Sequence, residues 1–141
     1  MRIYIAGKLS DETERTRLEE IDKICQELGF ETFLPHRDVG LVRGLHDAER
    51  VFQGDIIKGL AHCDVVVVSL EGLHIGSGTA WELGYAYAKN MPVIGIKTDE
   101  SVDEAIDYLS PILVASTKIA TSINELKQAL QALKTKLNPT T

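Results

Sequence analysis

The segment Asp64–Leu70 constrains the fold of this chain more than any other stretch. Its letters, DVVVVSL, form a continuous β-branched run in which polar and apolar residues do not alternate. Such a run is typical of a strand that is buried on both faces inside a parallel sheet covered by helices. A turn containing Gly76 and Gly78 follows, and then a helical pattern that ends near Lys89. We therefore expect a strand, a glycine-containing turn and a helix, with a ligand site at the carboxyl edge of the sheet.

The rest of the chain also alternates between short apolar strands and amphipathic helices. Further strands are expected at Arg2–Ala6, Glu31–Leu34, Pro92–Lys97 and Lys118–Thr121, and helices at Asp11–Leu28, Asp47–His62, Thr79–Lys89, Ser101–Leu109 and Ser122–Leu137. A loop is expected from Pro35 to about His46. Five strands joined by helices predict an α/β, flavodoxin-like three-layer fold with a five-stranded parallel sheet of order 2-1-3-4-5. No repeat or linker interrupts the pattern, so residues 1–141 are expected to form a single domain.

Composition and charge limit the classes of partner. The chain has 141 residues and a net charge of −6, and this acidity argues against binding a nucleic-acid polymer. The longest apolar run is too short to cross a membrane, and Met1 leads directly into a strand rather than a signal peptide. We therefore expect no membrane partner and a cytoplasmic location. Cys25 and Cys63 have no metal-ligand spacing around them, so we expect packed free thiols and no metal.

Glu82 is the main candidate for a catalytic residue. It lies between Trp81 and Leu83 in an otherwise apolar helix, where an isolated charge is costly unless a site uses it. Its position near the helix N-terminus predicts that the helix dipole keeps the carboxylate ionised. An ionised carboxylate beside a small-molecule cleft is a candidate nucleophile. The alternative is a solvated or ion-paired carboxylate on an amphipathic face.

Asp55 and Tyr4 are candidate partners of Glu82. Asp55 lies in the second long helix and either meets solvent or supplies a second carboxylate to the same cleft. Paired carboxylates with different pKa values can divide nucleophilic and acid–base roles. Tyr4 lies in the middle of the first strand, where a buried hydroxyl needs a hydrogen-bond partner. If it points toward the carboxyl edge, that partner is Glu82.

Polar residues that follow the first two strands are candidates for a ligand-binding wall. Gly7 and Lys8 follow the first strand, and His36 and Arg37 follow the second. Each polar side chain either meets solvent or binds the ligand, and Lys8 is suited to an anion. The turn at residues 76–78 does not match the dinucleotide fingerprint, because Trp81 stands where a third glycine is required. Residues 7–10 lack the upstream glycine of a P-loop, so no cofactor is expected.

Taken together, these residues resemble the nucleoside 2-deoxyribosyltransferase family over nearly the whole chain. The resemblance is carried by IYIAG at 3–7, FLPHRD at 33–38, the spacing of Asp55 and Cys63 before the third strand, and SGTAWELGYA at 77–86. It implies an enzyme without a cofactor that cleaves the N-glycosidic bond of 2′-deoxyribonucleosides or their 5′-monophosphates. It also implies that Glu82 attacks the anomeric carbon, that Tyr4 holds this carboxylate, and that Asp55 positions the substrate and assists proton transfer.

Two departures from the family pattern bear on the substrate. The transferases carry Asp at the position of Gly76 and an apolar residue or proline at the position of Lys8. The more positive charge here favours a substrate 5′-phosphate, bound by Gly76, Ser77 and Gly78. At these two positions the chain resembles the related branch of the family that hydrolyses 2′-deoxynucleoside 5′-monophosphates, and this resemblance implies water as the acceptor. Base exchange between deoxynucleosides is the alternative, and a non-catalytic nucleotide-binding module is a second one. The resemblance further implies a homo-oligomer in which Ser116 of a neighbouring subunit completes the site.

Overall fold

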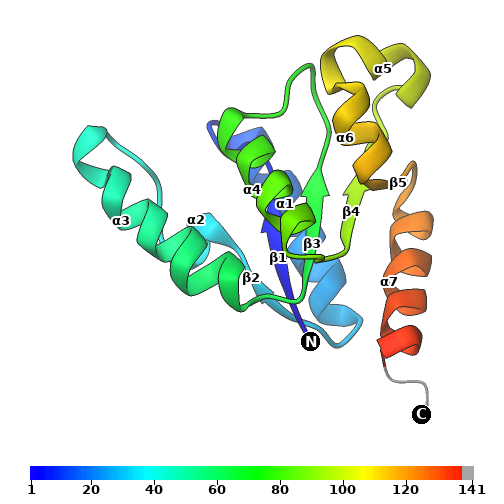
Figure 1. The fold of residues 1–141 in the computed structure, drawn as a ribbon, viewed down its shortest axis with the longest axis horizontal. Helices are drawn as coiled ribbons and strands as arrows, with labels where there is room; N and C mark the ends of the chain where they lie inside the picture. The colour runs from blue at the N-terminus through cyan, green and yellow to red at the C-terminus, as the bar shows by residue number, and fades with distance from the viewer. Residues whose placement is uncertain (138–141) are drawn as a thin grey trace.

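The computed structural model describes residues 1–137, and its centre is a five-stranded parallel sheet (Figure 1). The strands are β1 (Arg2–Ala6), β2 (Glu31–Phe33), β3 (Val65–Ser69), β4 (Val93–Ile96) and β5 (Lys118–Ala120). Their order is β2-β1-β3-β4-β5, which confirms the predicted α/β fold class and strand order. β1 and β3 pair in register from Ile3 with Val65 to Ala6 with Val68. The carboxyl ends of these two central strands therefore lie side by side.

Helices cover both faces of the sheet (Figure 1). They are α1 (Glu12–Glu27), α2 (Pro35–Asp38), α3 (Ala48–Phe52), α4 (Ser77–Ala88), α5 (Val102–Leu109), α6 (Pro111–Ser116) and α7 (Ile123–Leu137). Two 3-10 turns, η1 (Leu45–Asp47) and η3 (Leu60–His62), and a π-helical stretch, η2 (Gln53–Gly59), complete the order. α1 and α7 pack on one face of the sheet, whereas η2, α4 and α5 pack on the other.

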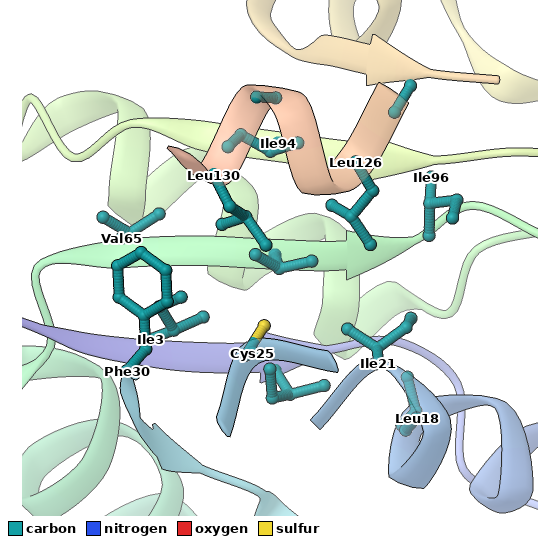
Figure 2. Packing of buried hydrophobic residues seen from close by; sticks show 14 of the residues in the cluster. Ile3, Leu18, Ile21, Cys25, Phe30, Val65, Ile94, Ile96, Leu126 and Leu130 are labelled. Atoms are coloured by element: carbon teal, nitrogen blue, oxygen red, sulfur yellow. The ribbon is translucent and has the colours of Figure 1, made fainter. Parts of the chain in front are cut away.

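The alternation of side chains along the strands divides the core into two clusters. Ile3 and Val65 point toward α1 and α7, and Figure 2 shows them with their neighbours Leu18, Ile21, Cys25, Leu126 and Leu130. Tyr4 and Val66 point to the opposite face, where they join a cluster that includes Ile56, Leu60 and Leu83. Because successive residues of a strand face opposite sides, the phenol of Tyr4 lies on the side of the sheet that carries both candidate carboxylates.

The helix boundaries differ from the sequence-based expectation where proline is involved. We expected Pro35 to begin a loop and Pro111 to follow the end of a helix, yet each also opens a short helix, α2 and α6. Proline is favoured at the first helical position because it lacks the N–H that would remain unpaired there. The capping box predicted at the start of α1 is confirmed, since Asp11 and Glu14 exchange side-chain to backbone hydrogen bonds of 2.8 and 3.3 Å.

Candidate active site

A cavity of about 520 Å³ lies at the carboxyl ends of β1 and β3, bounded by η2 and the start of α4. It is lined by Gly7–Ser10, Arg15, Pro35, Gly40–Val42, Val51, Asp55, Gly76–Thr79 and Glu82. This is the edge at which open α/β sheets hold ligands. The cavity brings together both candidate carboxylates and the glycine-containing turns that follow β1 and precede α4.

Tyr4 orients the carboxyl group of Glu82. The phenol is fully buried, and its hydroxyl donates a hydrogen bond to Glu82 Oε2. The ring of Phe33 stacks on the Tyr4 ring, with centroids 5.6 Å apart and an interplanar angle of 10°, which limits rotation of the phenol. Burial, and then the neighbouring charge of Glu82, raise the pKa of Tyr4. The hydroxyl therefore remains protonated and acts as a donor at physiological pH.

Burial dominates the ionisation of Glu82. It raises the pKa of this carboxyl group from 4.5 to about 7; the hydrogen bond from Tyr4 opposes this rise, and the charge of Asp55 adds to it. The prediction that the helix terminus keeps Glu82 ionised is wrong. Glu82 lies beyond the first turn of α4, where the partial positive charge of the terminus has already weakened.

Asp55 reaches the cavity from the π-helical stretch η2, which packs closely on its neighbours. A Cβ at Gly54 would lie 2.7 Å from Val39, and one at Gly59 would lie 2.7 Å from the Phe33 ring. Asp55 Oδ1 is buried and has no hydrogen-bond partner among residues 1–137. Burial raises the pKa of Asp55 to about 6, against the charge of Arg50. Local π-helical turns are common at functional sites, and here one presents a carboxyl group to the cavity.

Burial raises the pKa of both carboxyl groups toward neutral pH, to about 7 for Glu82 and about 6 for Asp55. The charge of Asp55 also contributes to the rise at Glu82, so the two titrations are linked. When one of the two groups is protonated and the other is not, one can act as a nucleophile or base while the other donates a proton.

The start of α4 forms a backbone surface suited to an anion, which we call the anion cradle (Gly76–Thr79). In the described part of the chain no side chain caps this helix, whose N-cap residue is Gly76. The first intrahelical bond runs from the Ala80 N–H to the Gly76 carbonyl at 3.0 Å, so the preceding N–H groups are available to a ligand. Helix N-termini of this kind bind phosphate and carboxylate groups.

Two basic residues lie at the same end of the cavity. Lys8 Nζ is 3.6 Å from Glu14 Oε2. The aliphatic stem of Lys8 passes close to Gly76, because a Cβ added at Gly76 would lie 3.2 Å from Lys8 Cγ. Arg15 Nη1 donates to the Leu9 carbonyl at 3.0 Å. The sequence analysis did not single out Arg15. The sequence feature that could have identified Arg15 is its position in the first turn of the helix that follows β1. This position brings it to the same edge of the sheet as Lys8.

The loop after β1 requires glycine at residue 7. Gly7 has φ of +154°, and a Cβ there would lie 2.8 Å from Leu18 Cδ2 in the core. A side chain would meet both backbone strain and a packed neighbour. Glycine thus lets the chain leave β1 steeply and carry Lys8 to the mouth of the cavity.

Three residues expected to bind substrate lie outside the cavity. His36 Nε2 is 3.1 Å from Glu19 Oε1, and Arg37 forms ion pairs with Asp22 and Asp38 at 3.0 and 2.8 Å. Both side chains project from α2 and are engaged by neighbouring carboxylates. Ser116 lies at the end of α6 in a separate groove beside α4, and its hydroxyl donates to the Ile112 carbonyl at 2.7 Å. Their roles in substrate binding stay predictions.

Among residues 1–137 there is no group of three His, Cys, Asp or Glu side chains arranged to hold a metal ion. Within the same range, every helix is too short or too polar to cross a membrane.

One family model matches nearly the whole chain. Residues 3–135 match the sequence model described as Nucleoside 2-deoxyribosyltransferase, so the chain belongs to the nucleoside 2-deoxyribosyltransferase family. It is therefore an enzyme of the group that acts on N-glycosidic bonds, and the family resemblance drawn from the sequence is confirmed. No curated protein sequence matches the chain significantly.

Solved structures share the fold at low sequence identity. A conserved protein from Enterococcus faecalis V583 is 21% identical with a TM-score of 0.73, and the alignment covers 94% of this chain and 98% of that one. The 2-deoxyribosyltransferase of Bacillus psychrosaccharolyticus is 20% identical with a TM-score of 0.72, covering 92% and 96%. The CMP N-glycosidase of Clostridium botulinum is 19% identical with a TM-score of 0.60, covering 93% and 99%.

Proposed function

We propose that this enzyme hydrolyses the N-glycosidic bond of 2′-deoxynucleoside 5′-monophosphates, with Glu82 as the nucleophile. One observation carries the proposal: a single cavity is lined both by carboxyl groups and by basic side chains with open backbone N–H groups. Asp55 and Glu82 line it together with Lys8, Arg15 and the anion cradle. A deoxynucleotide has matching ends, because its reacting C1′ needs carboxylates and its 5′-phosphate needs cations and N–H donors.

The reaction proceeds in two steps, formation of a deoxyribosyl ester on Glu82 and its hydrolysis by water. In the ligand-free protein the higher pKa of Glu82 places a single proton mainly on that residue, so the reacting form is the one in which this proton has moved to Asp55. First, the Glu82 carboxylate oxygen of this form attacks C1′; the C1′–O bond forms while the C1′–N bond breaks, and the departing base takes its electron pair and a proton from Asp55. Second, a water oxygen attacks C1′ and gives a proton to the Asp55 carboxylate, while Glu82 leaves as a carboxylate. The hydrogen bond from Tyr4 to Glu82 holds the nucleophile in one orientation throughout. A carboxylate that forms and then releases a glycosyl ester is typical of retaining glycosidases.

The choice of a phosphorylated substrate rests on the surroundings of Gly76. A side chain at this residue would begin 3.2 Å from the stem of Lys8, and a carboxylate there would repel a phosphate. Glycine instead leaves the N–H groups at the start of α4 open to an anion. Lys8 and Arg15 add positive charge at the same end.

Product analysis tests the proposal directly. The protein is incubated with a deoxynucleoside or its 5′-monophosphate, with and without a second free base, and products are separated by chromatography. We expect free base and 2-deoxyribose 5-phosphate from the monophosphate, whether or not a second base is present. Base exchange on the unphosphorylated nucleoside, without turnover of the monophosphate, would instead support a transferase. Binding without turnover, and no covalent adduct with a 2′-fluoro analogue, would identify a nucleotide-binding module.

We also propose that the enzyme works as a homo-oligomer in the cytoplasm. Large apolar side chains are exposed on α4 and α6, namely Trp81 at 52%, Tyr87 at 68% and Ile112 at 78%, and a groove lined by Ser116 runs between these helices. A second subunit seated there would bury this surface. The free, buried thiols of Cys25 and Cys63 suit a reducing compartment. Light scattering that finds only monomer at assay concentrations would contradict the oligomer.

A further inference from the structure

A fully buried lysine lies behind the loop that leads from β3 to α4. The Lys97 side chain is 0% exposed, and its ammonium nitrogen is 2.8 Å from Asp99 Oδ1. The same Nζ donates to the Leu70 carbonyl at 3.0 Å and to the Gly72 carbonyl at 3.3 Å. Three acceptors match the three donors of an ammonium group. Lys97 thereby joins the end of β4 to the first residues after β3.

Further hydrogen bonds of Glu71 and Gly72 hold the same loop after β3. Gly72 N–H donates to Asp99 Oδ2 at 2.7 Å, and the Glu71 carboxylate accepts hydrogen bonds from the backbone N–H and the hydroxyl of Thr98. Gly72 has φ of +91° although a Cβ there would meet nothing within 4 Å. The backbone conformation, rather than space, thus favours glycine at this residue. Every residue from 70 to 72 is bonded to the segment 97–99.

We propose that Lys97, acting with Asp99 and Glu71, is a positioning residue for the anion cradle. Three residues, Leu73 to Ile75, separate the bonded loop from Gly76, and Leu73 and His74 are exposed. The contacts at residues 70–72 therefore help to determine the direction in which the chain enters α4, together with the packing of His74 on Tyr108 and of Ile75 on the core. Among residues 1–137, the side-chain hydrogen bonds of Lys97 go to Leu70, Gly72 and Asp99, none of which lines the cavity, so Lys97 acts on the cradle through the loop.

Stability alone does not account for a lysine at this position. Replacing a buried ion pair by well-packed apolar residues is often neutral or stabilising. An ammonium with three directed bonds differs from an apolar side chain because it fixes two carbonyl groups and a carboxylate in one geometry. Small displacements of a binding group can change rates strongly even when the substitution is remote. The geometry therefore indicates that the lysine sets the position of the loop.

The inference rests on the proposed function, because it takes the cradle as the subsite for a 5′-phosphate. In the Lys97→Met variant, the long apolar stem is kept and the three directed bonds are lost. We expect KM for a deoxynucleoside 5′-monophosphate to rise about tenfold, while kcat and the KM for the unphosphorylated deoxynucleoside change by less than about twofold. Asp99→Asn removes the negative charge beside Lys97 but leaves the bonds of Nζ to the Leu70 and Gly72 carbonyls, and we expect a smaller shift in the same direction.

The matched control is Lys23→Met, which removes an exposed lysine on α1. Thermal unfolding of all variants establishes that they are folded at the assay temperature, and the milder Asp99→Asn serves if Lys97→Met is not. Parallel losses for both substrates, or no change in a folded variant, would overturn the role of Lys97. Failure of the wild-type enzyme to prefer the monophosphate would instead overturn the proposed function.

Hydrogen exchange of the ligand-free protein tests the positioning independently of any substrate. We expect amide exchange at residues 71–79 to be about tenfold faster or more in Lys97→Met, with exchange in α7 unchanged. Unaltered exchange at the cradle in a folded variant would show that the lysine does not hold the loop. This result is interpretable even if the enzyme acts on a different nucleoside.

Discussion

Replacing the proposed nucleophile should make the protein more stable at neutral and alkaline pH. Burial raises the pKa of Glu82 from 4.5 to about 7, so the folded protein holds this proton more tightly than the unfolded chain does. The stability conferred by the protonated group is fully present below about pH 4.5 and is lost as the pH rises through 7. The difference between the two pKa values corresponds to about 3 kcal/mol. Above pH 7, the wild-type protein carries this full cost.

The Glu82→Gln variant keeps the shape of the protonated side chain and cannot ionise, and its amide oxygen can still accept the hydrogen bond from Tyr4. We expect it to be more stable than the wild type by about 3 kcal/mol at pH 8, a rise in Tm of roughly 10 °C. At pH 5 the difference should shrink to about 1 kcal/mol. Denaturant unfolding at both pH values measures it, and activity should be abolished at both.

The control is Glu31→Gln, which changes an exposed carboxylate on β2 and should alter stability by less than about 0.5 kcal/mol. Two results would refute the reasoning. One is a Glu82→Gln variant no more stable than the wild type at pH 8. The other is a stability gain that does not depend on pH, because it would mean that packing rather than ionisation causes it.

Three further substitutions test the roles within the cavity by steady-state kinetics. Tyr4→Phe removes the hydrogen bond that lowers the pKa of Glu82, so this pKa should rise and kcat/KM at pH 7 should fall about 10- to 100-fold. The control is Tyr87→Phe at an exposed residue, and an equal loss in both variants would contradict the role of Tyr4 in holding Glu82. Asp55→Asn removes the charge that raises the pKa of Glu82, so this pKa should fall and kcat should drop by about 10² to 10⁴, with one limb of the pH profile lost; an unchanged profile would exclude Asp55 from proton transfer. Arg15→Ala should raise KM for a 5′-monophosphate about tenfold without affecting the unphosphorylated nucleoside, and a uniform effect on both would count against a phosphate contact.

The parallel sheet and the hydrogen bond between Tyr4 and Glu82 were predictable from the sequence. Both follow from the spacing of apolar residues along the chain and from the burial that this spacing requires. The β-branched run at Val65–Ser69 can satisfy its buried faces only between helices, and the alternation of helical and strand patterns then leaves few topologies. The hydrogen bond between Tyr4 and Glu82 could be predicted for the same reason. Tyr4 lies on β1 and Glu82 lies on the helix that follows the neighbouring strand β3, so a phenol directed toward the carboxyl edge can reach this carboxylate. Local pattern and global topology agree at these positions.

Other features of the site depend on tertiary contacts that no local pattern encodes. Within the π-helical stretch η2, Gly54 lies close to Val39 and Gly59 lies close to Phe33, and these residues are far apart in the sequence. The direction of the pKa shift at Glu82 was predicted wrongly because the helix terminus is visible in the sequence, whereas the burial that outweighs it is not. His36 and Arg37 follow a strand that ends at the correct edge, but α2 turns them toward the carboxylates on α1 and α2.

Glu82 and Lys97 are both buried ionisable residues, and their charged forms have opposite signs. One is a carboxyl group whose burial opposes its ionisation, and the other is an ammonium group with no exposed side-chain surface. A neutral amide and an apolar side chain of equal length would fill these spaces with less desolvation cost. Glu82 lies on the helix that follows β3 and Lys97 follows the last residue of β4, both toward the carboxyl edge of the sheet, whereas the cluster between α1 and α7 is built from apolar side chains and one thiol. Buried charge at this edge is therefore better explained by catalysis and by loop position than by folding. Stability gained on neutralising Glu82, together with loss of phosphate discrimination on neutralising Lys97, would separate these two causes within one molecule.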